Sequence, residues 1–370
     1  MNITGPATNE IIFSRSSRDI VVSDIPSGVP FEVYFTHNDQ SFGFAAREYN
    51  GKYTLRLSEV LKALESNTIA PAVPEGGFLN IYPEILTIKF ILNNHLQGTT
   101  TIRWIPGYCK ANTDDTDRLM QCGYWWTMRP QSAYTLPWSR EILQMAIPSE
   151  FKGKPVEIYA DVHFAEYGKK RLLYQTIPYV PAARLVAIDV SYKNIEALAF
   201  KSEYVDGHIM AYDIVGVVDG IEDLPVGQRF IVAPNNRNIR GWYFRNSLGA
   251  FDTVHSFGSV ARALESEVKT FTVNLKELEI SNISKEVFSI DTGYIKSKAE
   301  LNLWYEFLRS TERYAILSNN EISRIVVDES DSQKTLNEVG SISFKCRMSE
   351  DIQGYGFSKS RLEDFSEGFT

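Results

Sequence analysis

Aromatic residues crowd the stretch between Trp104 and Trp138, and they are the side chains of this 370-residue sequence that could most directly bind a ligand. Exposed rings stack on pyranose faces, so the group could form a glycan-binding platform. Trp125 and Trp126 are adjacent, so on a strand they point to opposite faces and only one can enter a given core. We expect the other to be exposed or to lie in an interface, and we favour contact with a neighbouring domain or subunit over glycan binding. The group consists of Trp104, Tyr108, Tyr124, Trp125, Trp126, Tyr134 and Trp138.

Oxygen ligands for a metal ion are concentrated in the acidic segment from Asn112 to Asp117. Carboxylate and amide oxygens suit calcium, but the segment lacks the central glycine and the terminal glutamate of an EF-hand loop. We favour a solvated turn between two strands, closed by hydrogen bonds from the Asn and Asp side chains.

Histidines and cysteines are too few and too scattered to indicate a metal site or a disulfide framework. None of the five histidines is spaced with another His or with a Cys as a pair of metal ligands would be. Cys109 and Cys122 could face one another across a hairpin, but we favour reduced thiols that pack. The residues are His37, His95, His163, His208, His255, Cys109, Cys122 and Cys346.

Signatures of catalysis are also missing from the sequence. It contains no phosphate-binding G-x-x-x-x-G-K-[ST] loop, no G-x-G-x-x-G after a strand, no G-x-S-x-G and no H-E-x-x-H. A pair of glycosidase carboxylates cannot be recognised among 46 acidic residues. We therefore expect a protein that is not an enzyme and that holds no cofactor and no metal.

Composition narrows the class of partner. The 38 Lys and Arg residues are outnumbered by 46 Asp and Glu residues, giving a net charge of −8, so the basic footprint of a nucleic-acid-binding protein is missing. The first residues lack the pattern of a secretory signal, and no later run is apolar enough to span a membrane. We expect no nucleic-acid partner, no membrane insertion, and folding in a cytoplasm.

The elements that must position these side chains are mostly strands. Apolar residues recur at alternate positions in four segments, as half-buried strands require, and turn residues such as Asn50-Gly51 and Asp219-Gly220 separate such runs. The segments are 31–36, 156–164, 186–192 and 271–275. The expected fold is mainly β: several antiparallel β-sandwich-like domains with two short helices.

Two segments have the spacing of amphipathic helices. In the first, Leu57, Val60, Leu61 and Leu64 form an apolar stripe. In the second, Ser297 and Glu300 have the spacing of a capping box, which predicts a helix from about Lys298 to Ser310. Its expected buried stripe is Leu301, Trp304, Tyr305 and Leu308. A third, shorter helix candidate runs from Arg140 to Ala146.

Proline-rich stretches suggest the domain boundaries. Residues 69–77 form the clearest loop, and the prolines at 178 and 181 suit a joint between domains because proline does not fit a central strand. We divide the chain into an N-terminal β domain with one helix (1–75), two β-sandwich-like domains (76–182 and 183–292), and a C-terminal helix with a β-hairpin (293–370).

The segment from Ile239 to Thr253 carries a more specific pattern: a strand ending in aromatic and basic residues, followed by Asn-Ser-Leu-Gly-Ala-Phe-Asp-Thr. It resembles a motif in structural proteins from the tail or baseplate region of tailed bacteriophages and prophages of Bacteroides-like hosts. Further segments are similar to the same proteins in the same order. They are 53–64, 126–130, 159–164, 186–192 and 325–344.

This resemblance implies a virion component that is assembled in the host cytoplasm and acts by binding other copies of itself and other tail proteins. A receptor- or glycan-binding module at the tail tip, contacting a host surface glycan, is the alternative. No catalytic residues are carried over. Asn246, Gly249 and Asp252 are expected to build a structural turn in which Gly249 takes the positive φ and Ala250 an ordinary conformation. Arg240 and Arg245 are expected at solvated strand ends.

Overall fold

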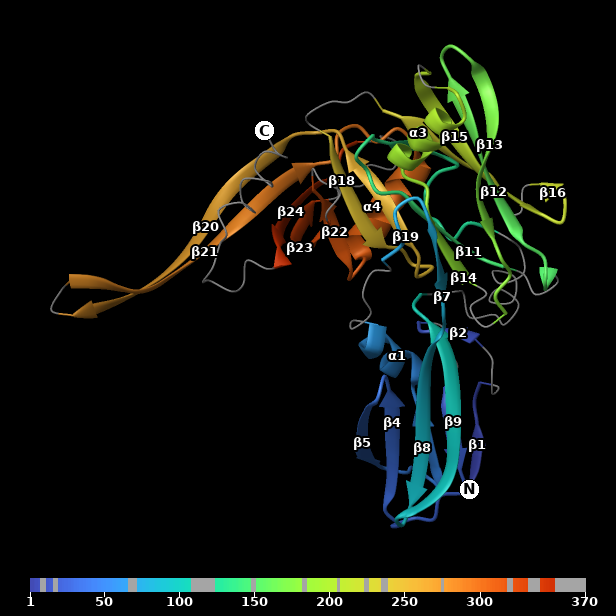
Figure 1. Cartoon of the computed structure of the whole chain (residues 1–370). Helices are drawn as coiled ribbons and strands as arrows, with labels where there is room; N and C mark the ends of the chain where they lie inside the picture. The colour runs from blue at the N-terminus through green and yellow to red at the C-terminus, as the bar shows by residue number, and fades with distance from the viewer. Residues whose placement is uncertain are drawn as a thin grey trace.

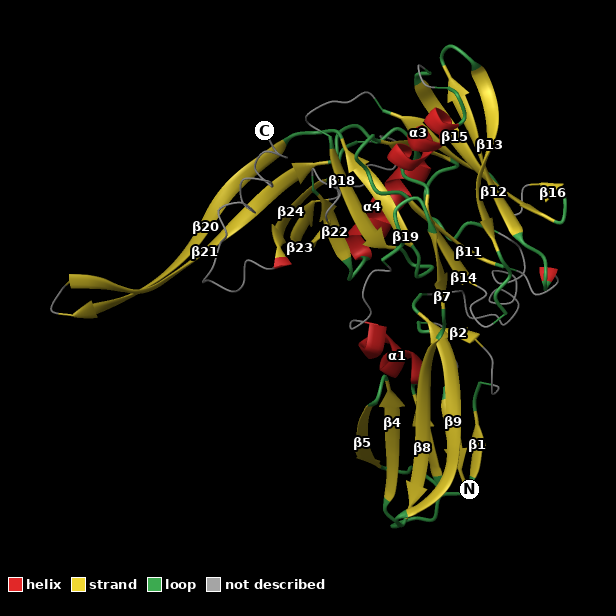
Figure 2. Cartoon of the chain, in the orientation of Figure 1, coloured by secondary structure: helices red, strands yellow, loops and turns green. Residues whose placement is uncertain are grey.

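The computed structural model of the chain is elongated, with a β-sandwich extending from one side of a larger body and a long hairpin projecting from another (Figure 1). Strands dominate and the helices are short (Figure 2). The structure describes residues 1–6, 11–15, 19–65, 72–107, 124–147, 151–181, 185–204, 207–222, 226–233, 239–273, 276–317, 322–331 and 340–349.

The N-terminal sandwich packs a five-stranded sheet, in the order β2-β9-β8-β4-β5, against a three-stranded sheet, in the order β1-β3-β6. Leu57, Leu61 and Leu64 of the predicted helix are buried in the core between the sheets, so this helix prediction is confirmed. The elements are β1 (Asn2–Thr4), β2 (Ile11–Phe13), β3 (Ile20–Ser23), β4 (Phe31–His37), β5 (Gln40–Ala46), β6 (Lys52–Leu55), α1 (Leu57–Glu65), β8 (Glu84–Leu92) and β9 (His95–Ile105).

The middle of the chain forms a second sandwich, whose sheets follow the orders β10-β17-β15-β12-β13, with β16 beside β15, and β11-β14-β7. Ile158, Ile188 and Ile195 meet in the core that these sheets share with a helix. The elements are β7 (Phe78–Ile81), β10 (Ser132–Thr135), β11 (Ile142–Ala146), β12 (Val156–Phe164), β13 (Gly168–Ile177), β14 (Leu185–Asp189), α3 (Tyr192–Lys201), β15 (Ile209–Val218), β16 (Ile221–Glu222) and β17 (Gln228–Val232).

The last sheet has seven strands in the order β19-β18-β22-β23-β24-β21-β20. One helix packs on it through Trp304 and Phe307, which contact Phe344. The elements are β18 (Arg240–Arg245), β19 (Phe251–Ser256), β20 (Val260–Val273), β21 (Lys276–Asp291), α4 (Lys298–Arg309), β22 (Arg313–Ile316), β23 (Ile322–Asp331) and β24 (Ser343–Met348).

Most of the expected fold is confirmed. The described part of the chain is mainly β and mostly antiparallel, the exceptions being the parallel pairs β2–β9 and β10–β17. The helix count was wrong because α3 was missed. Its buried stripe is only Tyr192, Ile195 and Ala199, and Ser191 makes no side-chain cap, so its sequence signal is faint. The candidate helix at Arg140–Ala146 is strand β11, whose five residues are all buried, so its apolar run carries no helical spacing.

The C-terminal helix is placed correctly, but its buried stripe is partly different. Ser297 Oγ accepts a hydrogen bond from the Glu300 amide at 3.1 Å, as predicted, while the Glu300 carboxylate accepts from the Lys296 amide in place of the cap amide. The fully buried residues are Leu303, Trp304 and Phe307, whereas Leu301, Tyr305 and Leu308 are only partly buried.

Four of the five sheets of the described residues cross the proposed domain boundaries. β4 pairs with β8 across residue 75, and β12 pairs with β15 and β7 with β14 across residue 182. Strands from both sides of residue 292 share the seven-stranded sheet. The boundaries therefore do not separate the sheets, and the division into four domains stays a prediction.

Candidate functional site

The turn between β18 and β19 contains Asn246 and Gly249, with the backbone conformation that the sequence predicts, and Asp252, the third residue singled out, lies just after it on β19. The Gly249 amide donates to Asn246 O at 3.0 Å, and the Ala250 amide donates to Asn246 Oδ1 at 3.1 Å. Gly249 has φ +86°, and Ala250 is not among the residues with positive φ. A Cβ on Gly249 would lie 1.7 Å from Pro106 O, so glycine is required both for the conformation and for close backbone approach.

Asp252 is the centre of a buried polar network just after this turn. Its carboxylate accepts four hydrogen bonds, three from residues 127–129, which are distant from Asp252 in sequence, and one from Asn246 in the turn. The donors are Thr127 Oγ1 at 2.6 Å, Met128 N at 2.8 Å, Arg129 Nη1 at 2.8 Å and Asn246 Nδ2 at 2.8 Å. Asn246 Nδ2 also donates to Trp126 O at 3.1 Å. The turn thus holds residues 126–129 against β19; we call this network the ionic junction.

Arg129 extends the junction to the start of β11. Its Nη2 donates to Glu141 Oε2 at 2.9 Å, and the side chains of both residues, like that of Asp252, are fully buried. Ser139 Oγ donates to the other Glu141 oxygen at 2.9 Å. Burial raises the pKa of Glu141 to about 7, although the Arg129 charge opposes this shift. A guanidinium bound by two carboxylates joins segments 123 residues apart.

His255 lies beside the junction, with Nε2 3.9 Å from Glu141 Oε1. Burial, with a smaller contribution from the Arg129 charge, lowers the pKa of His255 to about 3. The ring is therefore neutral at physiological pH. Within the described residues, no group of three or more His, Cys, Asp or Glu side chains is arranged to hold a metal ion.

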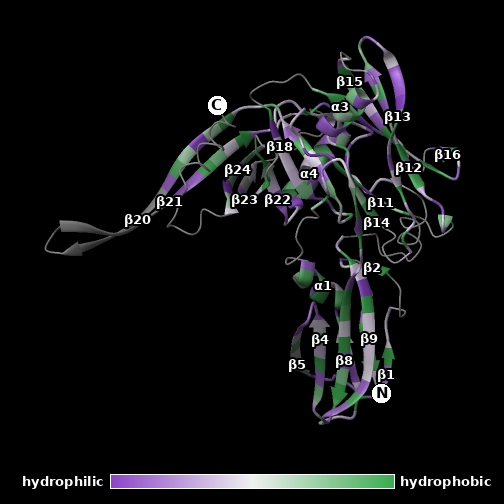
Figure 3. Cartoon of the chain, viewed as in Figure 1, coloured by the Kyte–Doolittle hydropathy of each residue, from purple (hydrophilic) through white to green (hydrophobic). Residues whose placement is uncertain are grey.

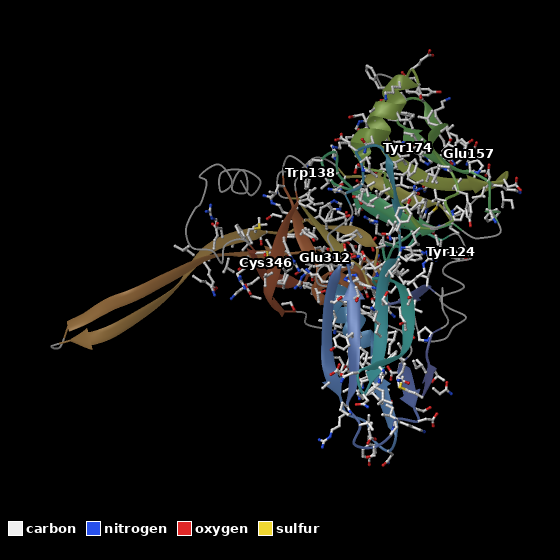
Figure 4. All side chains as sticks on the ribbon, turned by 60° about the horizontal axis from the view of Figure 1, so that its bottom comes forward. Tyr124, Trp138, Glu157, Tyr174, Glu312 and Cys346 are labelled. Carbon is white, nitrogen blue, oxygen red and sulfur yellow. The ribbon has the colours of Figure 1, made fainter. Side chains whose placement is uncertain are left out.

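Arg245 is buried, so the expectation that Arg240 and Arg245 lie at solvated strand ends is wrong. Arg245 Nε donates to Glu312 Oε2 at 2.5 Å, and its guanidinium lies 4.6 Å from the centre of the Phe251 ring. Arg240, at the start of β18, is also buried. Figure 4 places Glu312 on the C-terminal part of the molecule, away from Glu157 and Tyr174 on the middle sandwich.

A second polar contact lies where the N-terminal sandwich reaches the turn. Glu65, at the end of α1, accepts from the Gly107 amide at 3.0 Å and from Arg15 Nε at 2.9 Å, and Ser14 Oγ also donates to it. A Cβ on Gly107 would lie 2.5 Å from Leu248 O. The sandwich is therefore anchored directly against the β18–β19 turn.

Three of the four tryptophans proposed as a glycan platform are core residues. Trp125 and Trp126 do point to opposite faces, but each face meets a core: Trp125 packs in the middle sandwich, and Trp126 packs with Phe13 and Ala250. Neither ring is exposed; Trp126 lies where Phe13 of the N-terminal sandwich meets Ala250 of the β18–β19 turn, which agrees with the favoured contact with a neighbouring domain. Trp104 is fully buried in the N-terminal sandwich, and Trp138 is half-buried beside Gly241.

The other candidate residues give less information. Asn112–Asp117, Cys109 and Cys122 lie outside the described residues, so the proposed turn and thiols stay predictions. Cys346 is a buried free thiol whose pKa burial raises to about 12. No described helix is long and apolar enough to cross a membrane.

Sequence reasoning missed Arg129, Glu141, Glu65 and Glu312 as members of these networks. Arg129 lies in one of the resembling segments, but nothing in the spacing indicates its partners, which come from other strands. The arrangement supplies rigid attachment between strands.

Comparison with known proteins leaves the chain without an assigned family. No protein-family model matches it, and no curated protein sequence matches it significantly. Among solved structures, it is similar to a chain of the virion of a native gene transfer agent particle (11% identity, 32% of this chain and 95% of that chain, TM-score 0.21). A chain from the tail of an empty gene transfer agent particle is similar at 12% identity, with the same coverage and a TM-score of 0.22.

Extracellular domains 3–5 of Drosophila OTK also match, at 8% identity over 78% of this chain and 90% of that chain, with a TM-score of 0.22. These TM-scores are too low to carry an argument about function.

Proposed function

We propose that this protein is a non-enzymatic structural component of a tailed-phage virion, located in the tail or baseplate region, that acts by binding other copies of itself and other tail proteins. The motif resemblance suggests the setting. The observation that carries the assembly role is the β20–β21 hairpin, which projects from the body as a two-stranded arm (Figure 1).

The arm is long and has few neighbouring strands among the residues that the structure describes. At about 3.3 Å per residue, the 14 residues of β20 span roughly 46 Å. β20 pairs with β21 from Val260 to Val273, but only Phe288–Asp291 of β21 pair with a further strand, β24. A two-stranded ribbon is marginally stable in water. Such a ribbon gains stability when a partner covers it, as assembly with neighbouring subunits would.

The ionic junction supports the same role because it ties β19, at the edge of the seven-stranded sheet opposite the arm, to other parts of the chain. Buried charged pairs hold residues 126–129, Glu141 and β19 together, and Arg245 with Glu312 fixes β18 to the strand that follows α4. A rigid body with projecting parts suits a subunit that must present several contact surfaces in fixed relative positions.

The alternative of glycan binding at the tail tip loses its main support, because three of its four candidate tryptophans are buried in the cores of the fold and are not available to stack on a sugar.

Mass spectrometry of purified phage particles, followed by cryo-microscopy, tests the proposal. We expect the protein in particles as several symmetry-related copies, with the arm in contact with a neighbour. Shortening the arm by replacing residues 264–286 with a tight turn should abolish incorporation while leaving the thermal unfolding of the body nearly unchanged. Absence of the protein from purified particles would refute the proposal.

The matched control is a Leu264→Ser variant, which changes one exposed arm residue and keeps the arm length. It should be incorporated. Equal incorporation of the shortened protein would show that the arm is not an assembly element.

A further inference from the structure

Strand β5 ends the five-stranded sheet of the N-terminal sandwich, and no strand of the described residues pairs with its outer side. Six of its seven residues, Gln40 to Ala45, are exposed, and Figure 1 shows it at the outer margin of the sandwich. An open strand edge offers a row of backbone donors and acceptors to another strand.

The register determines which residues of β5 face outward. Asn38 and Asp39 both have positive φ, the mark of a two-residue type I′ turn, whose closing pair His37–Gln40 is hydrogen-bonded. The other side of β4 gives the same result independently: the carbonyl oxygen of Pro30, just before β4, accepts a hydrogen bond from the Asn93 amide, just after β8. The backbone groups of the even-numbered residues of β4 therefore point to β8, and those of the odd-numbered residues point to β5. Alternation then leaves the backbone groups of Ser41, Gly43 and Ala45 on the open edge.

The other long terminal strands are protected, in the described part of the chain. Among the strands that end a sheet, only β5, β13 and β20 have seven or more residues. β13 carries Lys169, Lys170 and Arg171, and much of it is hydrophilic in Figure 3. β20 carries Arg262 and Glu265. Charged residues on an edge discourage the addition of another strand there, although a partner can still pack over the faces of the β20–β21 arm, and β5 has no charged residue.

Two apolar side chains at this edge are also only partly covered. Phe42 and Phe44 both stack on Phe35, with ring centroids 5.0 Å and 5.8 Å apart, so they lie on the core side of the sheet. Phe35 is fully buried, yet Phe42 and Phe44 remain 45% and 43% exposed. Two aromatic rings are therefore only half covered within one copy of the chain.

The sequence of β5 is self-complementary about Gly43: Phe-Gly-Phe lies between small residues. If two copies pair antiparallel around a two-fold axis at Gly43, Gly43 meets its counterpart and Ser41 meets Ala45, both as hydrogen-bonded pairs. Phe42 then meets Phe44 at the closer, non-hydrogen-bonded positions, where aromatic pairs stabilise a sheet. The outward-facing groups found above are the ones this pairing needs, and neither strand brings a like charge.

We propose that β5 is a homodimer contact, at which a second copy of this chain adds its β5 antiparallel about Gly43 to form one continuous sheet. The contact is isologous and closes with two copies. It does not depend on the virion role: failure of the dimer leaves the particle experiment unaffected, and a protein absent from particles can still dimerise through β5.

Paired charge variants at Ser41 and Ala45 test the proposal by sedimentation velocity of the full-length protein. The wild type should form a dimer of the 42.0 kDa chain. Ser41→Lys with Ala45→Lys places like charges opposite one another twice and should weaken the dimer by at least about tenfold. Ser41→Glu with Ala45→Lys places opposite charges there and should dimerise at least as well as the wild type.

Both double variants carry Lys at position 45, opposite Glu32 of the same chain, and they differ only at position 41. Any effect of the lysine at position 45 on the folding of the monomer is therefore the same in both. Thermal unfolding should show both folded.

Hydrogen exchange at single-residue resolution gives a second, positional readout. In the dimer, the amides of Ser41, Gly43 and Ala45 should be protected, and the double-lysine variant should lose that protection at positions 41, 43 and 45. The amides of Phe42 and Phe44, which face β4, should stay protected in both.

A wild type that stays monomeric at about 100 µM, or dimerisation unchanged by the lysines, would overturn the proposal. So would a monomer whose β5 cross-links only to a different protein in particles.

Discussion

The ionic junction and the β4–β5 hairpin differ in whether their polar and apolar groups find partners within the chain. Around Asp252, charged side chains are fully buried, and each finds partners from another part of the same chain. At β5, uncharged backbone and two half-exposed phenylalanines are left open. A buried charge without a partner costs far more free energy than a strand edge that is open to water. The charged groups of the junction are therefore paired within the chain, whereas the edge of β5 can stay open until a partner binds.

The largest expected effect comes from breaking the junction at its centre. Asp252→Ala removes the acceptor of four hydrogen bonds and leaves Arg129 buried with one carboxylate in place of two. The free energy of unfolding should fall by about 3–5 kcal/mol, as when one partner of a buried ion pair is removed. Chemical denaturation measures this. A loss below about 1 kcal/mol would show that the junction does not hold the segments together.

Gly249→Ala tests the turn on which the junction rests. Positive φ alone costs an alanine about 1 kcal/mol, and the overlap of its Cβ with Pro106 O adds to that, so we expect a loss of about 3 kcal/mol. Gly153→Ala is the matched control, because Gly153 has φ +82° with open space around its Cβ position. Equal losses for the two variants would mean that the approach to Pro106 does not matter.

The pH dependence of stability separates the two titrating groups of the junction. Because the pKa of Glu141 is raised from 4.5 to about 7, the folded state holds its proton longer, and stability falls as pH rises through that window. Because the pKa of His255 is lowered from 6.5 to about 3, the unfolded state takes up protons first, and stability falls as pH drops through that window.

Between pH 4.5 and 6.5 these two slopes oppose each other. In Glu141→Gln only the histidine slope remains, so stability should fall on acidification by of the order of 1 kcal/mol per pH unit. His255→Gln should show the reverse slope. Urea denaturation at several pH values is the measurement, and profiles parallel to the wild type would contradict the assignment.

The smallest effect is expected at the open edge. Phe42→Ala removes a ring that is nearly half exposed and should cost the monomer only about 1 kcal/mol. Phe35→Ala, at the fully buried ring on which Phe42 stacks, should cost about 3–5 kcal/mol. Thermal unfolding of both variants at a concentration where the protein is monomeric checks the contrast; similar losses would mean that Phe42 is covered within one chain.

Local patterns in the sequence determined local structure. The alternation at 31–36 and 156–164 predicted β4 and β12, and the leucine stripe predicted α1. The Asn-Ser-Leu-Gly turn required positive φ at Gly249, and Ser297 caps α4. Each depends on backbone preferences within a few residues, which the sequence states directly.

Only the tertiary structure decided what covers each face and which charges meet. Alternation correctly sent Trp125 and Trp126 to opposite faces, but a period of two says nothing about a second core on the far side. Arg129 and Asp252 are separated by 123 residues, and Arg245 and Glu312 by 67, so no local spacing could pair them. Burial and charge pairing arise from long-range packing, which is also why β5 remained open while the tryptophans did not.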